Sequence, residues 1–292
     1  MDSQIDISVI TVNFNGFSDT CEFIDSWVAT ILSVSFEIIV IDNGSTKDES
    51  SLLKQRYPFL NVIRSEKNLG FAGANNIGIK VAKGKYLFFL NNDVVLTHDT
   101  VHLLVNRLSS LKQIAGVSPL IRDYHVPHAI QFAGYTPLSF IKLRNQAIGE
   151  GKLDGEYPAS PTPYLHGAAM LMKANAVRLI GSMPEEYFLY YEELDWCTHI
   201  TDLGFQLWYE PACEIYHKGS TTTGKNSPLK AYYLSRNRLL FTYRNRTGIT
   251  RYTAIFYQLV IVLPKDMLKA LIRGQIYVAI AHLKGIIAFI KL

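Results

Sequence analysis

The first 96 residues alternate between short apolar strands and helical segments, and this alternation restricts the fold more than any other feature. Strands are expected at Ile7–Val12, Glu37–Ile41 and Asn61–Arg64, and a further apolar run occupies Tyr86–Leu90. Repeated strand–helix units build a parallel sheet with helices on both faces. The sequence therefore predicts an α/β fold with a mostly parallel central sheet.

Polar residues follow three of these predicted strands. Asn13 follows the first strand, Asp42 the second, and Asn91, Asn92 and Asp93 follow the last apolar run. The carboxyl ends of parallel strands meet at one edge of a sheet, where open α/β folds bind ligands. Taken alone, the triplet fits a plain turn or helix cap as well as it fits a ligand site, because Asn and Asp are common in turns and caps. Its repetition at other strand ends favours a nucleotide pocket.

The sequence offers no standard loop for phosphate. It contains no GxxxxGK[ST] motif, and GFAGAN, at residues 70–75, lacks the three-glycine spacing of a dinucleotide site. A divalent metal held by Asp93 is therefore the candidate partner of a diphosphate. His217 follows a predicted strand, and a neutral imidazole could join the oxygen ligands, although a lone histidine is as often structural.

Three acids, Glu192, Glu193 and Asp195, lie among the aromatic residues of YFLYYEELDW, at residues 187–196. One interpretation is capping of a helix over Glu193–Asp202, since negative charge is favourable at a helix N-terminus. The other is a carboxylate kept basic beside an aromatic wall, which would serve as a general base. The residues alone leave both open.

The remaining segments are expected to support this core. Residues 123–163 contain five prolines and suggest an irregular, hairpin-rich insertion. Further elements are expected in the second half of the chain: strands at Gln206–Tyr209 and Ala212–Tyr216, a loop at Thr221–Gly224, and a helix at Leu229–Arg246.

The C-terminal tail is basic and apolar. From Arg251 onward it has six Lys or Arg and one acid, so the net charge of the tail is +5. The whole chain has a net charge of +4, so the first 250 residues carry −1. The weak charge of the main body argues against nucleic acid as a partner. In a helix, three cations (Lys265, Lys269, Arg273) would lie on one face and three apolar residues (Leu268, Leu271, Ile272) on the other. This pattern fits a helix that lies on an anionic membrane surface. It also fits a helix that packs on the domain or forms a homo-oligomer contact.

Other patterns concern the compartment. The cysteines, Cys21, Cys197 and Cys213, are too few and too widely spaced for a disulfide framework, which favours a reducing environment. The N-terminus is not expected to be a signal peptide. The apolar run Tyr252–Pro264 has 13 residues, whereas a spanning helix needs about 20. We therefore expect a cytoplasmic protein that could lie peripherally on the inner membrane face.

Seven motifs in this order resemble the family-2 inverting glycosyltransferases of the GT-A fold, in particular their rhamnosyltransferase-like branch. The likeness covers about residues 7–246, and its motifs are VITVNFNG (9–16), IDNGS (41–45), NLGFAGANNIG (68–78), LNNDV (90–94), HGAAM (166–170), YYEELDWC (190–197) and HKGS (217–220). The resemblance implies a glycosyltransferase domain over residues 1–228, with a nucleotide-binding half (1–120) and an acceptor half (121–228). A helical segment would follow at 229–292.

The resemblance also implies roles for individual residues. Glu193 would be the catalytic base, with Glu192 and Asp195 as alternatives, and Asp93 and His217 would bind Mg²⁺ or Mn²⁺. The acceptor side would hold His166, Gly167 and Trp196. The donor would contact a larger set, namely Val12, Asn13, Asp42, Ser45, Asn68, Gly70, Asn75, Asn91 and Asn92. Asn91 stands where the family's DxD motif has its first acid, so metal affinity should be weaker here.

The resemblance implies a single displacement from a nucleotide diphosphate sugar. The first donor expected is dTDP-rhamnose, with UDP-sugars as alternatives, and the acceptor would be a glycan or a lipid-linked glycan. Two other functions remain open on the sequence. A polyprenyl-phosphate sugar transferase would need no base, and a non-catalytic nucleotide-sugar-binding protein would need neither Glu193 nor His217.

Overall fold

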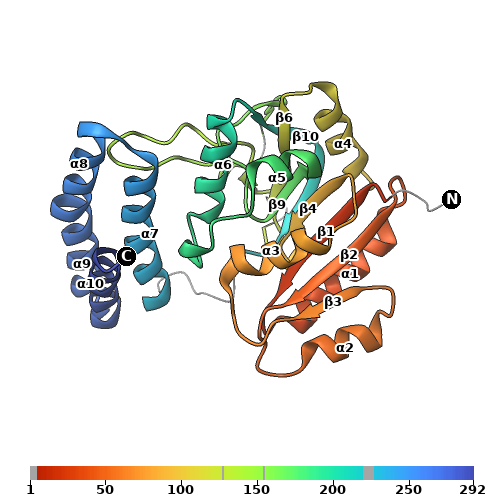
Figure 1. Cartoon of the computed structure of the whole chain (residues 1–292), viewed down its shortest axis with the longest axis horizontal. Coiled ribbons are helices and arrows are strands. Elements are labelled where there is room, and N and C mark those ends of the chain that lie inside the picture. The colour runs from red at the N-terminus through yellow and green to blue at the C-terminus, as the bar shows by residue number, and fades with distance from the viewer. Residues whose placement is uncertain (1–4, 127, 154, 220–226) are drawn as a thin grey trace. The chain divides into compact units, whose positions relative to one another are not determined.

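The computed structural model describes residues 5–126, 128–153, 155–219 and 227–292 (Figure 1). It divides into two compact units. The first unit contains the residues up to Thr136, Gln146–Phe188 and Glu192–Gly219. The second unit contains Pro137–Asn145, Leu189–Tyr191 and the C-terminal residues after Gly219. The predicted loop Thr221–Gly224, and Ser220 of HKGS, lie outside the described residues.

Within the described residues, the strands of the first unit form one ten-stranded sheet. The main path runs β3-β2-β1-β4-β9-β6-β10-β5, with β7 beside β6 and β8 beside β10. The strands are β1 (Ile7–Asn13), β2 (Phe36–Asp42), β3 (Asn61–Arg64), β4 (Tyr86–Leu90), β5 (Val94–Val95), β6 (Ile114–Asp123), β7 (Ile130–Phe132), β8 (Ser160–Pro161), β9 (Ala169–Lys173) and β10 (Gln206–His217).

Most of the long strands run in one direction. β1 is parallel to β2 and β4, β2 to β3, and β6 to β10. β9 is antiparallel to both of its neighbours, β4 and β6, so those two also run in the same direction. The mostly parallel sheet predicted from the sequence is confirmed.

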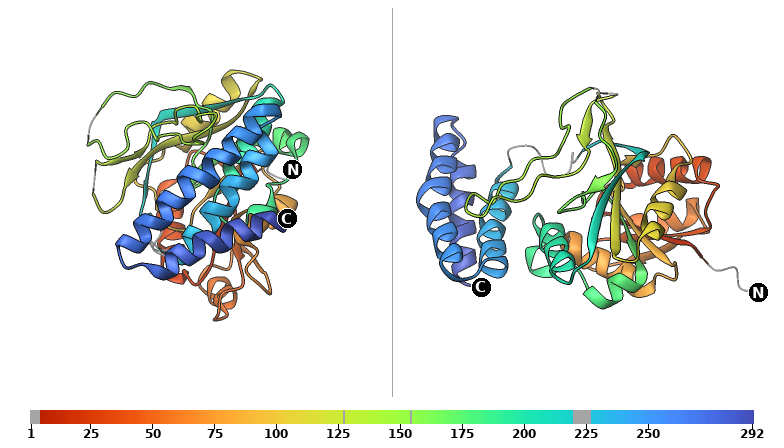
Figure 2. Two further views of the ribbon diagram at one scale, coloured as in Figure 1. Left: turned by 90° about the vertical axis from the view of Figure 1, so that its left-hand side faces the viewer. Right: turned by 90° about the horizontal axis from the view of Figure 1, so that it is seen from above.

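Helices cover both faces of this sheet (Figures 1 and 2). The helices of the first unit are α1 (Phe17–Thr30), α2 (Glu49–Arg56), α3 (Gly70–Val81), α4 (Val101–Ser110), α5 (Ala174–Ile180), the short 3₁₀ turn Glu185–Tyr187 and α6 (Glu192–Asp202). In β4, Phe88 packs against Trp27 of α1 and Phe89 against Trp196 of α6, with ring centroids 6.0 and 5.8 Å apart. Successive strand residues point to opposite faces, so this all-apolar strand is buried on both sides.

The prediction of two separate strands between Gln206 and Tyr216 is wrong. Gln206–Tyr209 and Ala212–Tyr216 belong to a single strand, β10, which pairs with β6 on both sides of an irregularity between Glu210 and Glu214. Pro211 lies in this interval. Because proline has no N–H to donate, it interrupts the ladder locally and marks a bulge.

The second unit is helical. It contains α7 (Pro228–Asn245), α8 (Gly248–Tyr257), a π-helical turn (Gln258–Val262), α9 (Leu263–Ile272) and α10 (Ile276–Ile290). α10 packs closely on α7, since a Cβ at Gly285 would lie 2.5 Å from the carbonyl oxygen of Tyr232. No helix of the described residues is both long enough and apolar enough to cross a membrane.

Candidate active site

The polar strand ends lie together at the carboxyl edge of the sheet. Asn13 and Asp42 are register partners at the ends of β1 and β2. Asn91 follows β4 directly, and its backbone N–H donates to the carbonyl of Ala168, which precedes β9. The antiparallel insertion of β9 therefore places HGAAM beside LNNDV, although the two motifs are far apart in the sequence.

The side chain of Asp42 is fully buried at this edge. Its Oδ1 accepts a hydrogen bond from the backbone N–H of Ser45 at 3.2 Å, whereas Oδ2 has no hydrogen-bond partner among the described residues. Arg64 Nε lies 3.8 Å from Oδ2. A buried carboxylate oxygen without a donor is costly, so this atom fits an N–H group supplied by a ligand.

A hydrogen-bond chain ties the other predicted donor residues together. Asn13 donates to Ser45 Oγ and to Glu49, and it accepts from the hydroxyl of Thr20 at 2.7 Å. Asn92 in turn donates to Thr20 Oγ1 at 2.9 Å. Val12 is half-buried beside them. The ends of β1, β2 and β4 thus form one connected polar wall.

The glycine-rich loop is fixed by asparagines. The Asn43 side chain donates to Asn68 and to the Gly70 carbonyl, and it accepts from the backbone of Leu69. Gly70 has φ +74°, and a Cβ there would lie far inside contact distance of the Phe188 backbone. Asn75 lies inside α3, almost fully buried, and donates to a backbone carbonyl one turn earlier. Its amide is therefore engaged by the helix.

Asp93 and His217 face each other. His217 ends β10 and pairs with Val94 of β5, which places its Nε2 3.2 Å from Asp93 Oδ1 and 3.3 Å from Asn91 Nδ2. The Gln131 amide donates through Nε2 to Asp123 and to the His217 carbonyl, so its Oε1 must accept from His217 Nδ1, at 2.8 Å. In the neutral ring the hydrogen is therefore on Nδ1, and Nε2 presents its lone pair.

This tautomer is the one that metal-binding histidines adopt, with the second nitrogen donating to an oxygen. Asp93 Oδ1 is buried and no hydrogen-bond donor of the described residues reaches it. The two side chains thus offer one carboxylate oxygen and one imidazole nitrogen. Among the described residues no group of three His, Cys, Asp or Glu is arranged to hold a metal. A divalent ion fits between these two groups if oxygens of water and of a bound phosphate complete its coordination shell, as is common for Mg²⁺ sites.

His166 and Gly167 connect this pair to the acidic motif. The His166 ring lies 6.0 Å from that of His217 and stacks on Tyr135 with an interplanar angle of 9°. Burial and the neighbouring His217 lower the pKa of His166 to about 3, so it is neutral near pH 7. A Cβ at Gly167 would lie 3.8 Å from Glu193 Oε1, so nothing separates the Gly167 backbone from that carboxylate.

The three candidate bases differ in their surroundings. Glu193 is in α6, and burial raises the pKa of its carboxyl. Glu192 and Asp195 are almost fully buried and take part in interactions within the protein. Trp196 is also buried, with its ring on Phe89 and its Nε1–H donating to the Gly181 carbonyl. Of the acidic residues in this motif, Glu193 is the one that lies beside Gly167.

The residues before α6 adopt an unusual backbone. Phe188, Tyr190 and Tyr191 have φ values of 63°, 68° and 78°, in the left-handed region that disfavours side chains. Within the second unit, Asn237 of α7 donates to the carbonyls of Leu189 and Tyr190 at 2.7 and 2.9 Å. Helix α7 therefore holds the segment that leads into Glu192.

Several residues of the site were not predicted. Gln131 orients His217, Asn43 organises the glycine-rich loop and Thr20 links Asn13 to Asn92. Gln131 lies in the irregular insertion, where no periodicity or motif marks it. Asn43 lies within the IDNGS turn, and its position directly after a buried strand is the signal that could have identified it.

Comparison with known proteins agrees with this geometry. Residues 8–178, more than half of the chain, match the family described as Glycosyl transferase family 2. An N-acetylglucosaminyl-diphospho-decaprenol L-rhamnosyltransferase of Mycobacterium tuberculosis (strain H37Rv) is 24% identical over 221 residues, covering 68% of this chain and 72% of the relative. Rhamnosyltransferase WbbL of Escherichia coli (strain K12) is 29% identical over 196 residues (62% and 72%). dTDP-rhamnosyl transferase RfbF of Shigella flexneri is 24% identical over 227 residues (73% and 72%).

Solved structures show the same fold. GalNAc-T7 with UDP, GalNAc and Mn²⁺ has a TM-score of 0.63 at 14% identity, covering 91% of this chain and 58% of that chain. Mannosyltransferase PcManGT from Pyrobaculum calidifontis, in complex with GDP-Man and Mn²⁺, has a TM-score of 0.61 at 14% identity (99% and 88%). The GT-A fold expected from the sequence is confirmed. The chain belongs to glycosyl transferase family 2, within which it is similar to the rhamnosyltransferases.

Proposed function

We propose that this glycosyltransferase transfers a sugar, with inversion, from a nucleotide diphosphate donor to a hydroxyl of a glycan or lipid-linked glycan. The observation that carries the proposal is the position of Glu193. Its carboxylate lies beside Gly167, and the adjoining His166 ring leads to the Asp93–His217 pair. On this proposal, the base and the two metal ligands belong to one continuous site.

The donor would bind at the ends of β1 and β2. Asp42 Oδ2, which has no hydrogen-bond partner among the described residues, would accept the imide N–H of a thymine or uracil base. Asn13 and Ser45 would support it, together with Val12 and the loop residues Asn68 and Gly70. The relatives named rhamnosyltransferases, one of them a dTDP-rhamnosyl transferase, support dTDP-L-rhamnose as the first donor to test.

Asp93 and His217 would hold Mg²⁺ or Mn²⁺, and the two structural neighbours were solved with Mn²⁺. When bound, such an ion neutralises charge on the leaving diphosphate. Asn91 donates to His217 Nε2 in the structure, so it must release this nitrogen for metal binding. That competition, together with the absence of a second carboxylate, predicts weaker metal affinity than a DxD site provides.

The remaining chemistry belongs to Glu193 and its surroundings. Glu193 takes the proton of the acceptor hydroxyl, whose oxygen forms a bond to the anomeric carbon while the bond to the diphosphate oxygen breaks. Burial raises the pKa of Glu193, which makes the carboxylate a stronger base than an exposed glutamate. The neutral His166 and the Gly167 backbone line the acceptor side and leave the proton to Glu193.

The test compares Glu193→Gln with Glu186→Gln, an exposed acid close in sequence. Glu193→Gln should lower kcat about 10²–10⁴-fold, the usual contribution of a general base, and leave donor affinity unchanged. Glu186→Gln should keep both. Turnover of dTDP-rhamnose onto a lipid-linked acceptor and calorimetry of donor binding measure the two effects. Normal turnover by Glu193→Gln would contradict the base assignment and favour an acceptor phosphate, which needs no base.

We further propose that the second unit attaches the enzyme to the inner face of the cytoplasmic membrane, where a lipid-linked acceptor would lie. Leu268, Ile272 and Tyr277 are 57%, 76% and 80% exposed, and the cations Lys265 and Lys269 are exposed near them. Large exposed apolar side chains interspersed with lysines suit an interfacial helix on anionic lipid.

Sedimentation with phosphatidylglycerol vesicles tests this attachment. The Leu268→Ser/Ile272→Ser variant should lose sedimentation and keep its fold, because both side chains are exposed. Light scattering of the same variant measures the oligomer mass and so distinguishes a homo-oligomer contact from membrane attachment. A loss of oligomer mass with unchanged vesicle binding would refute membrane attachment through this face.

A further inference from the structure

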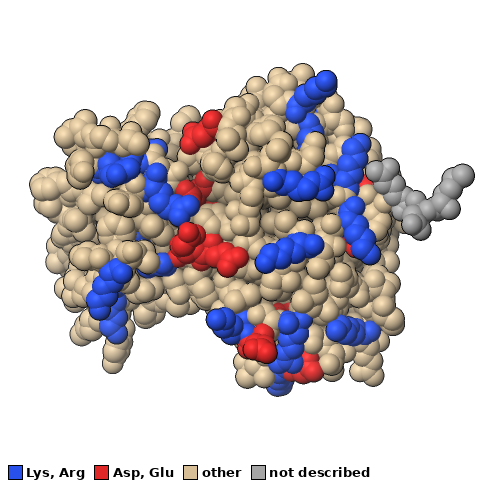
Figure 3. Space-filling model, viewed as in Figure 1, with Lys and Arg blue, Asp and Glu red and all other residues tan. Residues whose placement is uncertain are grey.

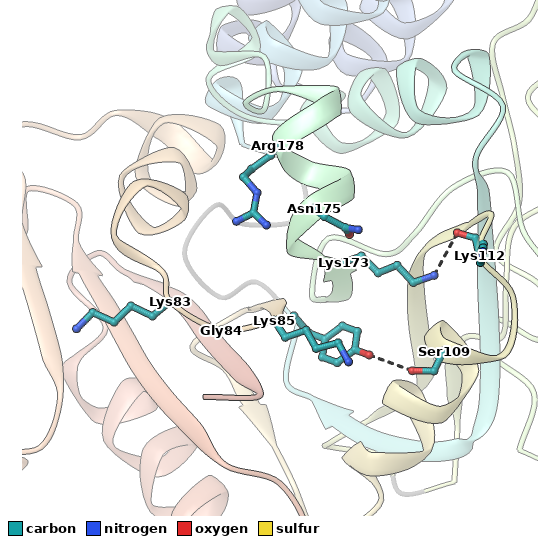
Figure 4. Close-up of a pocket in the computed structure, with 9 residues that line it drawn as sticks. Lys83, Gly84, Lys85, Ser109, Lys112, Lys173, Asn175 and Arg178 are labelled. Carbon is teal, nitrogen blue, oxygen red and sulfur yellow. Dashed lines mark hydrogen bonds between the residues drawn. The ribbon is translucent and has the colours of Figure 1, made fainter. Parts of the chain in front are cut away.

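A second pocket lies at the opposite edge of the sheet from the candidate active site (Figure 4). Its floor includes Lys85 and Tyr86, at the amino end of β4, whereas Asn91 follows the carboxyl end of the same strand. At about 3.3 Å per residue, β4 separates the two sites by roughly 17 Å. The pocket has a volume of about 740 Å³, which is enough for a nucleotide-sized ligand.

The charged residues that line this pocket are all cations. They are Lys83, Lys85, Lys112, Lys173 and Arg178, and the other lining residues are Gly84, Tyr86, Ser109 and Asn175. In the close-up, Arg178 and Lys85 project into the pocket from opposite sides, whereas Lys83 extends away from the others (Figure 4). On the face shown in Figure 3, basic side chains also gather over the first unit with few acids among them.

These cations have no acidic partner among the described residues, whereas some other cations of the unit do. Arg107, Arg122 and Lys218 form ion pairs of 2.6–2.7 Å with carboxylates. No carboxylate of the described residues lies within ion-pair distance of the five pocket cations. Glu37 lies near the rim, but its carboxylate accepts from the hydroxyl of Ser8 and from the backbone of Lys83.

The fold holds some of these charges in place. Lys173 Nζ donates to the carbonyls of Leu111 and Lys112 at the end of α4, at 2.9 and 3.3 Å. Lys85 Nζ lies 5.3 Å from the centre of the Tyr86 ring. Burial, and to a smaller extent the positive charge of Lys85, lowers the pKa of Lys173, so these two cations lie close enough to repel each other. An anion between them would relieve this repulsion.

We propose that this pocket binds an anion that carries a phosphate group. Phosphate oxygens accept several charge-assisted hydrogen bonds, and the Arg178 guanidinium supplies a forked donor opposite the lysine ammonium groups. The group could belong to a soluble diphosphate or to a phospholipid headgroup, and the chemistry of recognition is the same. The site is separate from the donor pocket and does not depend on the function proposed for it.

The experiment uses the full chain in EDTA, so that no metal recruits diphosphate to Asp93. The Lys85→Gln/Arg178→Gln variant removes two exposed charges, and Lys54→Gln/Lys152→Gln removes two exposed charges elsewhere on the same unit. Lys173 stays unchanged because it ties down α4. Inorganic pyrophosphate is the soluble probe, and vesicles of phosphatidylglycerol or of phosphatidylcholine are the membrane probes. Calorimetry, sedimentation and mass spectrometry of lysine acetylation measure binding.

Binding in the pocket should protect Lys85 and Lys112 from acetylation, whereas Lys54 should be modified as before. The pocket variant should bind the protecting probe about tenfold or more weakly, because it lacks two of the cations that contact the anion. Protection by pyrophosphate identifies a soluble ligand, and weaker binding of the variant to anionic vesicles alone identifies a headgroup. Equal acetylation with and without both probes, or an equal loss in the control variant, would overturn the proposal.

Discussion

Gln131 sets the tautomer of His217, so replacing Gln131 should weaken the metal binding proposed for Asp93 and His217 while both of these residues stay unchanged. In Gln131→Met the side chain keeps its length but loses three hydrogen bonds, to His217 Nδ1, the His217 carbonyl and Asp123. His217 is buried, and a buried polar group left without a partner costs about 1–3 kcal/mol. Gln131 itself is half-buried, so water can replace part of this loss. We expect a net destabilisation of about 1–3 kcal/mol.

Metal affinity should fall more clearly than stability. Removing an outer-shell partner of a metal-binding histidine usually costs about 10–100-fold in affinity. Calorimetric titration with Mn²⁺ in the presence of a nucleotide diphosphate measures this loss, and denaturant unfolding measures stability. Gln131→Glu keeps an acceptor for Nδ1–H but loses both donors, so its stability should fall while its Mn²⁺ affinity falls less.

Gln206→Met is the matched control. Gln206 also uses its amide oxygen in one hydrogen bond, from the Trp208 ring nitrogen at 3.1 Å, but it lies at the start of β10. This variant should bind Mn²⁺ as the wild type does. If Gln131→Met binds Mn²⁺ with wild-type affinity, the argument that Gln131 orients His217 for a metal is refuted.

Three further predictions concern the same enzyme. Asn91→Asp replaces the amide that contacts His217 Nε2 with a carboxylate, so Mn²⁺ affinity should rise about 10-fold or more; equal affinity in calorimetry would contradict this. Because burial raises the pKa of Glu193 and the base must be deprotonated, kcat/KM should fall on the acid side with an apparent pKa above the ordinary glutamate value of 4.5; a profile flat down to pH 5 would speak against it. Asn237→Ala removes the donor to two carbonyls and should lower stability by about 1–3 kcal/mol together with kcat. Asn245→Ala, which removes a hydrogen bond within α7, should leave kcat unchanged, and equal kcat in both variants would refute a positioning role for Asn237.

The half of the sheet before residue 96 could be predicted because β1, β2 and β4 are largely buried and polar residues stand at or directly after their ends. Tyr86–Leu90 is apolar throughout for this reason, and Asp93 follows it closely. The position of β9 between β4 and β6 could not be predicted, since nothing in Ala169–Lys173 specifies its neighbours or direction. The sequence therefore indicated Gly167 and Glu193 as separate motifs, and only the fold shows that they are adjacent.

The predicted metal residues illustrate the same limit. Asp93 and His217 were expected in one site through the family likeness, and the structure places their side chains 3.2 Å apart. Gln131 could not be found in this way, because its role depends on tertiary contacts with Asp123 and His217 alone. The two strands predicted around Pro211 are one strand, β10. A bulge at a proline inside a continuous strand has the same local sequence pattern as a turn between two strands.

The left-handed segment before α6 has a consequence for engineering the enzyme. Each of Phe188, Tyr190 and Tyr191 carries a backbone cost of about 1–3 kcal/mol, and α7 supplies the hydrogen bonds to the carbonyls of Leu189 and Tyr190. A truncated chain that ends before Pro228 lacks these donors while retaining the strained residues. Chimaeras that exchange the C-terminal helices between relatives should therefore join after α7, so that Asn237 stays with the Leu189–Tyr191 segment whose carbonyls it binds.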